Sequence, residues 1–226
     1  MDIPAEYLKR RQLIKKRLAD FKMLYSGQVS WFYNAGDIGL RKVMSDDGQR
    51  LFEEMCFCIL AANGTAASSM KAVDASRDIL MHGSEGDIQK ALKSSGVRFH
   101  NRAEYIVYNR ENLRKDIGLD IKKIIESYED KKELREFLAD YIKGFGFKES
   151  SHFLRNIGVG GFAILDKHIL RSMHELGFMT DIPKSLAKKK YLETEKYYML
   201  MSRALKIDPD ELDLLLWSMK NGRIMK

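Results

Sequence analysis

The chain has 226 residues, and its 39 lysines and arginines against 32 aspartates and glutamates give a formal net charge of +7. Because no run of about 18 apolar residues occurs and the first residues are charged, we expect neither a membrane span nor an export signal. The positive charge favours a polyanionic partner without requiring one.

Helix signals dominate the first third of the chain. Ser45 and Asp46 predict the start of a helix that runs through Leu60, and Thr65 can cap the helix after it. Alternation typical of a strand is short and confined to residues 28–32, where a turn explains it equally well.

The two cysteines exclude several kinds of metal site. Cys56 and Cys58 lie two positions apart on an expected helix, where their side chains diverge by about 200°. Two cysteines are too few for a four-cysteine zinc site or an iron–sulfur cluster, and the spacing of His168 and His174 fits no known zinc motif. We therefore expect no metal and no cofactor, and a reducing, cytoplasmic location.

Helical spacing continues to the end of the chain. Apolar side chains recur at helical intervals in residues 134–142 and 169–176, and Asp208 followed by Pro209 predicts the start of a last helix. No long linker divides the sequence. These patterns predict an all-α protein of about ten or eleven helices in one compact unit, residues 1–226.

The segment 133–158 carries the clearest chemical signal. Two amphipathic helices meet across Gly144-Phe145-Gly146-Phe147. Glycines at this spacing allow unusual backbone conformations and leave N–H groups exposed at the positive start of the second helix, where a DNA phosphate can bind. Gly144 and Gly146 are also what an ordinary tight connection requires, so the turn alone leaves both interpretations open.

Lys148 follows this turn in the first turn of the second helix. A cation is disfavoured there by roughly 0.3–1 kcal/mol, which argues against a purely structural lysine. Partial burial beside the positive helix end would favour the neutral amine, which is a nucleophile. Pairing with a phosphate is the alternative. His152 lies four residues later on the same face, where packing is a better explanation than proton transfer.

A glycine-rich loop, residues 159–166, ends at Asp166. This residue is a natural N-cap for the helix that follows, and capping alone would explain it. The glycines also let the chain reverse, which would bring the carboxylate near Lys148. An amine with a neighbouring carboxylate suits displacement at C1′ of a sugar, because one group attacks while the other stabilises positive charge.

The run KGFGFKESSHFLRNIG, followed by AILDKHILRSM, resembles the hairpin, glycine-rich loop and catalytic aspartate of the helix-hairpin-helix DNA glycosylases. Among these, the chain is most similar to the archaeal-type second class of 8-oxoguanine DNA glycosylase/lyase. Residues 51–73 resemble a family helix that ends in a wedge, and residues 217–226 resemble the short C-terminal pocket tail of that class. The resemblance implies an all-α, two-lobed fold with the active site between the lobes.

The resemblance also implies roles for individual residues. Lys148 matches the nucleophilic lysine of bifunctional members, Asp166 matches the catalytic aspartate, and Gly144 and Gly146 match the glycines that bind the DNA backbone.

Four further residues match the base pocket or the wedge. Trp217 and Phe99 would stack on the flipped base, Lys226 would supply a polar contact, and Asn63 would fill the gap left in the duplex. Core packing explains Phe99 and Trp217 equally well, and Asn63 with Gly64 can simply end a helix.

We therefore expect a base-excision repair enzyme that removes 8-oxoguanine from damaged double-stranded DNA and cleaves the abasic site through a lysine Schiff base and β-elimination. It would act as a monomer, near the nucleoid, without a metal or cofactor. Three alternatives remain: a glycosylase of the same fold for another damaged base, a non-catalytic helix-hairpin-helix DNA-binding protein that uses Lys148 as a phosphate contact, and a helical protein–protein scaffold.

Overall fold

The structure, a computed structural model, describes residues 2–27, 29–34, 37–42, 46–62 and 64–226. These residues form eleven α-helices, one 3₁₀ turn and a two-stranded hairpin. The elements in chain order are α1 (Ile3–Ser26), β1 (Val29–Asn34), β2 (Asp37–Lys42), α2 (Asp47–Ala61), α3 (Ala66–Leu80), α4 (Glu85–Ser94), η1 (His100–Arg102), α5 (Ala103–Ile117), α6 (Ile121–Glu126), α7 (Lys131–Tyr141), α8 (Phe147–Asn156), α9 (Lys167–Glu175), α10 (Lys188–Leu205) and α11 (Pro209–Asn221). None of the described helices is long and apolar enough to cross a membrane.

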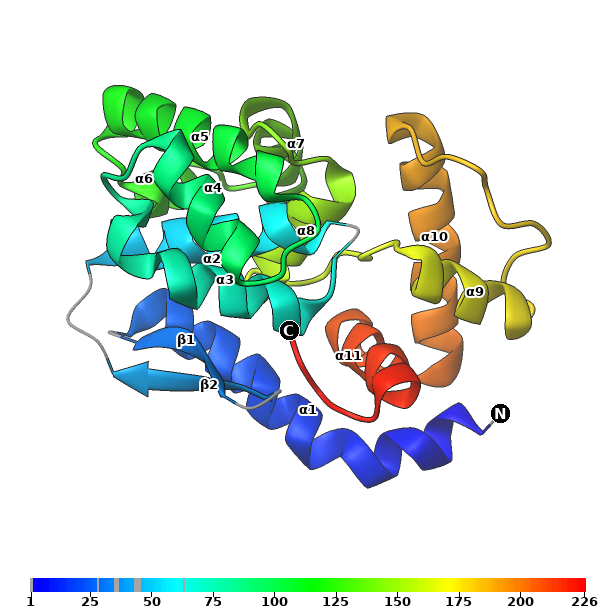
Figure 1. Ribbon diagram of the computed structural model, residues 1–226. Coiled ribbons are helices and arrows are strands. Elements are labelled where there is room, and N and C mark those ends of the chain that lie inside the picture. Colours follow the sequence, from blue (N-terminus) through cyan, green and yellow to red (C-terminus); the bar gives the residue numbers. More distant parts are fainter. Residues whose placement is uncertain (1, 28, 35–36, 43–45, 63) are drawn as a thin grey trace.

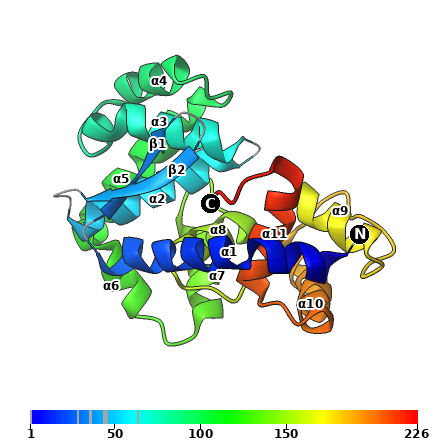
Figure 2. The same ribbon diagram turned by 90° about the horizontal axis from the view of Figure 1, so that it is seen from below.

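The helices form two lobes joined along one side by α1. Figure 1 shows α2 to α8 gathered in one lobe and α9, α10 and α11 in the other. Helix α1 runs beneath both, and Figure 2 shows it crossing from one to the other; it packs against α11 in one lobe and against α2 and α8 in the other. The predicted all-α, two-lobed architecture is confirmed.

Side-chain caps fix the helix starts that the sequence predicts. The carboxylate of Asp46 accepts from the N–H of Gln49 at 2.7 Å, and the hydroxyl of Thr65 accepts from the N–H of Ser68 at 3.1 Å. Asp208 caps α11 immediately before Pro209. Each cap satisfies N–H groups that the first turn of a helix leaves without partners. Ser45 lies outside the described residues.

The β-hairpin is more extensive than the sequence predicts. Residues 29–32 of the predicted short strand belong to β1, which continues to Asn34 and pairs antiparallel with β2. The pattern gave no sign of β2, because Ile38 is its only buried residue and no alternation develops. The hairpin packs against α3, where the guanidinium of Arg77 donates to the carbonyl of Trp31 at 2.5 Å.

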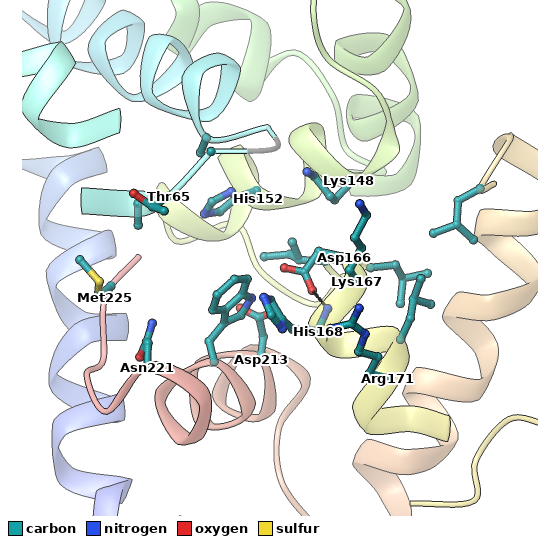
Figure 3. Close-up of a pocket in the computed structure, with 18 of the residues that line it drawn as sticks. Thr65, Lys148, His152, Asp166, Lys167, His168, Arg171, Asp213, Asn221 and Met225 are labelled. Atoms are coloured by element: carbon teal, nitrogen blue, oxygen red, sulfur yellow. Dashed lines mark hydrogen bonds between the residues drawn. The ribbon is translucent and has the colours of Figure 1, made fainter. Parts of the chain in front are cut away.

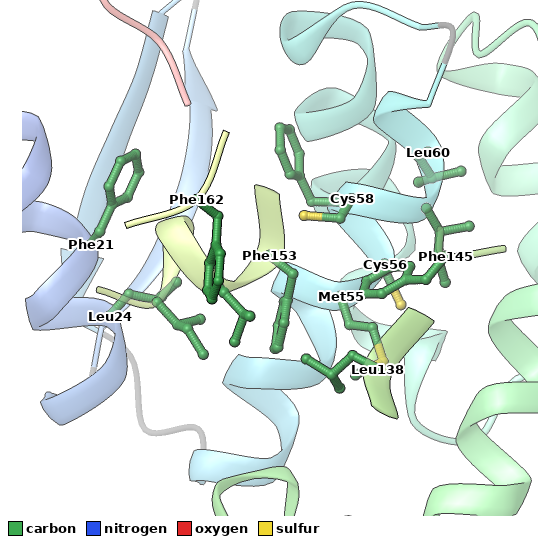
Figure 4. Packing of buried hydrophobic residues seen from close by; sticks show 14 of the residues in the cluster. Phe21, Leu24, Met55, Cys56, Cys58, Leu60, Leu138, Phe145, Phe153 and Phe162 are labelled. Carbon is green, nitrogen blue, oxygen red and sulfur yellow. The ribbon is translucent and has the colours of Figure 1, made fainter. Parts of the chain in front are cut away.

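Helix α2 forms the centre of the larger lobe. Its residues 50–60 are all buried, and α3, α5, α6 and α8 pack around it. Figure 4 shows Cys56 and Cys58 in this core with their sulfurs pointing apart. Both are free thiols, and burial raises the pKa of each well above its usual range. These cysteines fill space in the core and are unreactive there.

Candidate active site

The connection between α7 and α8 requires glycine at one of its two predicted positions. Gly144 has φ +94°, and a Cβ there would lie 2.7 Å from the ring of Tyr105. Gly146 has extended backbone with φ −130°, and its N–H donates to Oε2 of Glu149 at 3.3 Å. The amide of Asn109 braces the turn by bonding both the N–H and the carbonyl of Lys143 at 2.9 Å. This helix-hairpin-helix turn between α7 and α8 is therefore held in a defined shape at the start of α8.

Lys148 occupies the first turn of α8. Its ammonium lies 2.8 Å from Oε1 of Glu149, and its side chain is 25% exposed. Figure 3 shows the lysine extending from α8 into the space above Asp166. The amine is thus half-buried, paired with one carboxylate and open to a cavity.

Asp166 caps α9. Its Oδ1 accepts from the N–H groups of His168 at 2.8 Å and Ile169 at 2.9 Å. The predicted N-cap is confirmed, and because both bonds end on the same oxygen, Oδ2 is not needed for the cap. Capping therefore leaves one carboxylate oxygen for chemistry in the cavity.

The glycine-rich loop delivers Asp166 to this place. Gly161 has φ +100°, and its N–H donates to both oxygens of Asp210 at 3.1 and 3.3 Å. A Cβ on Gly160 would lie 1.7 Å from the same carboxylate. A side chain at Gly160 would clash with Asp210 of α11, and Gly161 adopts a backbone conformation that favours glycine, so these two glycines allow the loop to pass close to α11 on its way to Asp166.

A cavity of about 1180 Å³ lies between the two lobes. It is lined by the larger lobe at α8 and at the turn before α3, and by the smaller lobe at α9 and α11. The predicted residues on its wall are Phe99, Lys148, Asp166, Trp217 and Lys226. Gly144 and Gly146 do not line it, and Asn63 lies outside the described residues, although its neighbours Gly64 and Thr65 are on the wall.

The two predicted stacking residues are half-buried on the cavity wall. The indole of Trp217 meets the ring of His168 edge-on, with centroids 4.5 Å apart. The ring of Phe99 lies under two guanidinium groups, with Arg98 5.4 Å and Arg102 4.7 Å from its centroid. Both rings line the cavity and both also pack on protein, so stacking on a base remains a prediction for each.

Lys226 reaches the cavity only through its main chain. Its side chain is fully buried and forms an ion pair with Glu54 of α2. The ammonium also lies 4.0 Å from the ring centroid of Phe57, and burial lowers its pKa to about 8. A polar contact from Lys226 to a bound base would therefore come from the backbone, while the side chain anchors the tail.

Comparison with known proteins decides the family. Residues 39–207 match the family described as 8-oxoguanine DNA glycosylase. The chain belongs to this family.

Relatives in this family are similar over most of their length. The 8-oxoguanine DNA glycosylase/AP lyase of Methanocaldococcus jannaschii is 41% identical over 176 residues, which is 77% of this chain and 82% of the relative. The enzyme of the same name from Thermotoga maritima is 37% identical over 188 residues, or 82% and 87%. The crystal structure of the M. jannaschii glycosylase/lyase in complex with a 15mer DNA containing 8-oxoguanine aligns with a TM-score of 0.82 and 34% identity, covering 100% of both chains.

The cavity wall of this 8-oxoguanine DNA glycosylase family member contains a buried charge pair that sequence reasoning missed. Arg155 of α8 and Asp213 of α11 are 3.3 Å apart, and both are less than 5% exposed. Burial raises the pKa of Asp213 to about 7, opposed by Arg155 and reinforced by Asp166. The sequence does contain a signal for this pair: Asp213 is a single acid within the apolar run of α11, four residues before Trp217.

His152 also belongs to the cavity wall, one turn after Lys148. Its ring packs edge-on against Phe57 with centroids 5.7 Å apart. Burial lowers its pKa well below the usual range, and Arg155 and Lys148 lower it further. The imidazole is therefore neutral at physiological pH and is too weak a base to take a proton from an ammonium, in line with the packing role favoured by the sequence.

Among the described residues, no cluster of three or more histidine, cysteine, aspartate or glutamate side chains could hold a metal ion.

Proposed function

We propose that this protein excises 8-oxoguanine from double-stranded DNA and cleaves the resulting abasic site, with Lys148 as the nucleophile and Asp166 as its catalytic carboxylate. The observation that carries the proposal is the position of both groups on one cavity, each at the start of a helix. The names of the family members, 8-oxoguanine DNA glycosylase/AP lyase, support the substrate and the two activities.

The chemistry begins with a nucleotide turned out of the duplex, because C1′ cannot be reached inside the base stack. The neutral amine of Lys148 attacks C1′, and the bond from C1′ to the base breaks with its electron pair leaving on the base. Asp166 stabilises the positive charge that develops on the sugar. The deoxyribose ring then opens to a Schiff base on Lys148. Loss of a proton from C2′ then expels the 3′ phosphate by β-elimination.

Residues on the cavity wall and at the α7–α8 turn would meet the other requirements of this reaction. Trp217 and Phe99 offer aromatic faces for the expelled base, and a stacked base gains about 1–3 kcal/mol. Gly144 and Gly146 would hold the DNA backbone, and Asn63, next in sequence to Gly64 and Thr65 of the cavity wall, would fill the gap in the duplex. The protein would act as a monomer, because one chain contains every group that the proposed reaction uses. It would work near the nucleoid, where its DNA substrate lies.

Borohydride trapping tests the proposal, because reduction of the Schiff base joins enzyme and DNA permanently. Wild-type protein incubated with an 8-oxoguanine duplex and borohydride should give a covalent complex, and Lys148→Gln should give none. Lys143→Gln, which removes a partly exposed lysine just before the same turn, is the matched control and should still trap. Wild-type yield from Lys148→Gln would refute the assignment of the nucleophile. Trapping on duplexes with other damaged bases but not with 8-oxoguanine would refute the substrate.

A further inference from the structure

Glu149 connects the two groups on which the proposed reaction depends. Its Oε2 accepts the N–H of Gly146, the hairpin N–H expected to bind a DNA phosphate, at 3.3 Å. Its Oε1 lies 2.8 Å from the ammonium of Lys148. One carboxylate therefore occupies both the anion position of the hairpin and the counter-ion position of the nucleophile.

A carboxylate and a phosphate compete for such a position because both present anionic oxygens to the same donors. The start of a helix attracts either one through its free N–H groups and its positive dipole end. Two anions at this distance repel each other, so a phosphate that binds the N–H of Gly146 must displace the side chain of Glu149. The bond to be broken is weak, since 3.3 Å is longer than the common range of about 2.7–3.2 Å.

We propose that Glu149 is a positioning residue that holds the ammonium of Lys148 in an ion pair until a DNA phosphate at the hairpin displaces its carboxylate, after which the ammonium gives up its proton to water and reacts as the neutral amine. Arrival of the backbone would thus be coupled to availability of the nucleophile. A free lysine amine in a cavity would otherwise meet any small aldehyde or abasic sugar, and an ammonium held by a carboxylate does not react with it. This inference rests on the proposed function, because it assumes that Lys148 attacks and that Gly146 binds phosphate.

Capping is the competing explanation for Glu149. The residue is third in α8, and its bond to the N–H of Gly146 is that of a capping box. Glu149→Gln separates the two explanations, because glutamine also accepts this N–H bond but carries no charge for Lys148. The variant should keep the thermal stability of the wild type if its cap is intact. Glu133→Gln removes the same charge from an exposed position on α7 and is the matched control.

The experiment uses abasic-site duplexes in which one phosphate at a time is replaced by a neutral methylphosphonate, and it measures the rate of borohydride trapping. For wild type and Glu133→Gln, one position near the lesion should slow trapping at saturating enzyme at least about tenfold, because no anion displaces Glu149. Glu149→Gln should show less than about a threefold effect at that position, since its lysine is already free.

Three results would overturn the inference: equal sensitivity of Glu149→Gln and wild type at every position, no sensitive position for the wild type, or slower trapping by Glu149→Gln on unmodified DNA. No trapping by any of the three proteins on unmodified duplex would instead refute the proposed function.

Discussion

Glu54 on α2 and Lys226, 172 residues later, form an ion pair in which both side chains are completely shielded from solvent. The second oxygen of Glu54 accepts from the amide of Asn156 on α8 at 2.6 Å. The C-terminal tail is thereby attached to α2 and α8 of the larger lobe, and its position on the cavity wall depends on this ion pair.

Breaking this pair from one side should strongly destabilise the protein. Glu54→Gln leaves the ammonium of Lys226 buried without a counter-ion, which costs about 3–5 kcal/mol in comparable cases. Chemical denaturation should show this loss. The double variant Glu54→Gln/Lys226→Met removes both charges and should recover most of the stability. If the losses of unfolding free energy in Glu54→Gln and in Lys226→Met added up to the loss in the double variant, a direct interaction would be contradicted.

Replacing Asp166 should separate its structural role from its catalytic one. Asparagine is as good an N-cap as aspartate, so Asp166→Asn should fold with nearly wild-type stability and bind DNA normally. Without the negative charge beside C1′, its excision rate should fall by at least about a hundredfold, or 2.7 kcal/mol in the transition state. Single-turnover kinetics and DNA binding measured together check this. If DNA binding and the excision rate fell by the same factor, capping of α9 would be the only role left for Asp166.

The aromatic residues of the cavity should control selectivity. Trp217→Ala and Phe99→Ala should each weaken discrimination between 8-oxoguanine and guanine, with a loss of about 1–3 kcal/mol in binding of the lesion. Tyr197→Ala, which removes an exposed ring on α10, is the control. Competition between duplexes with the lesion and with guanine provides the measurement. If a variant matches the Tyr197 control, that residue is part of the core and not of the pocket.

The buried carboxyl of Asp213 should make stability depend on pH. Burial raises its pKa from 3.8 in the unfolded chain to about 7 in the folded protein, so the folded state holds the proton more tightly. This contribution to stability is present at low pH and is lost as the pH rises through the interval between the two values. Asp213→Asn stays neutral throughout and should lack this loss, whereas the exposed Asp140→Asn on α7 should follow the wild type. Parallel pH profiles of unfolding free energy for Asp213→Asn and the wild type would contradict the shift.

What the sequence could predict depended on how far apart the interacting residues lie along the chain. Lys148 and Asp166 follow short glycine-containing turns, and their positions at helix starts are local properties that a sequence displays. The hairpin strand β2 was missed because it buries a single side chain and has no periodicity to detect. The pairs Arg155–Asp213 and Glu54–Lys226 were missed because each joins distant segments, and only the fold brings the partners together.

Helix α1 has a consequence for how the protein handles its substrate. Its 24 residues run unbroken under both lobes and pack against helices of each (Figure 2). A large change in the angle between the lobes would require α1 to bend or to lose its contacts with one of them, so we expect the width of the cavity to change little when nucleic acid binds. We therefore expect the DNA, rather than the protein, to undergo the bending when the two bind. Lesions that soften the duplex should then be the easiest to accommodate.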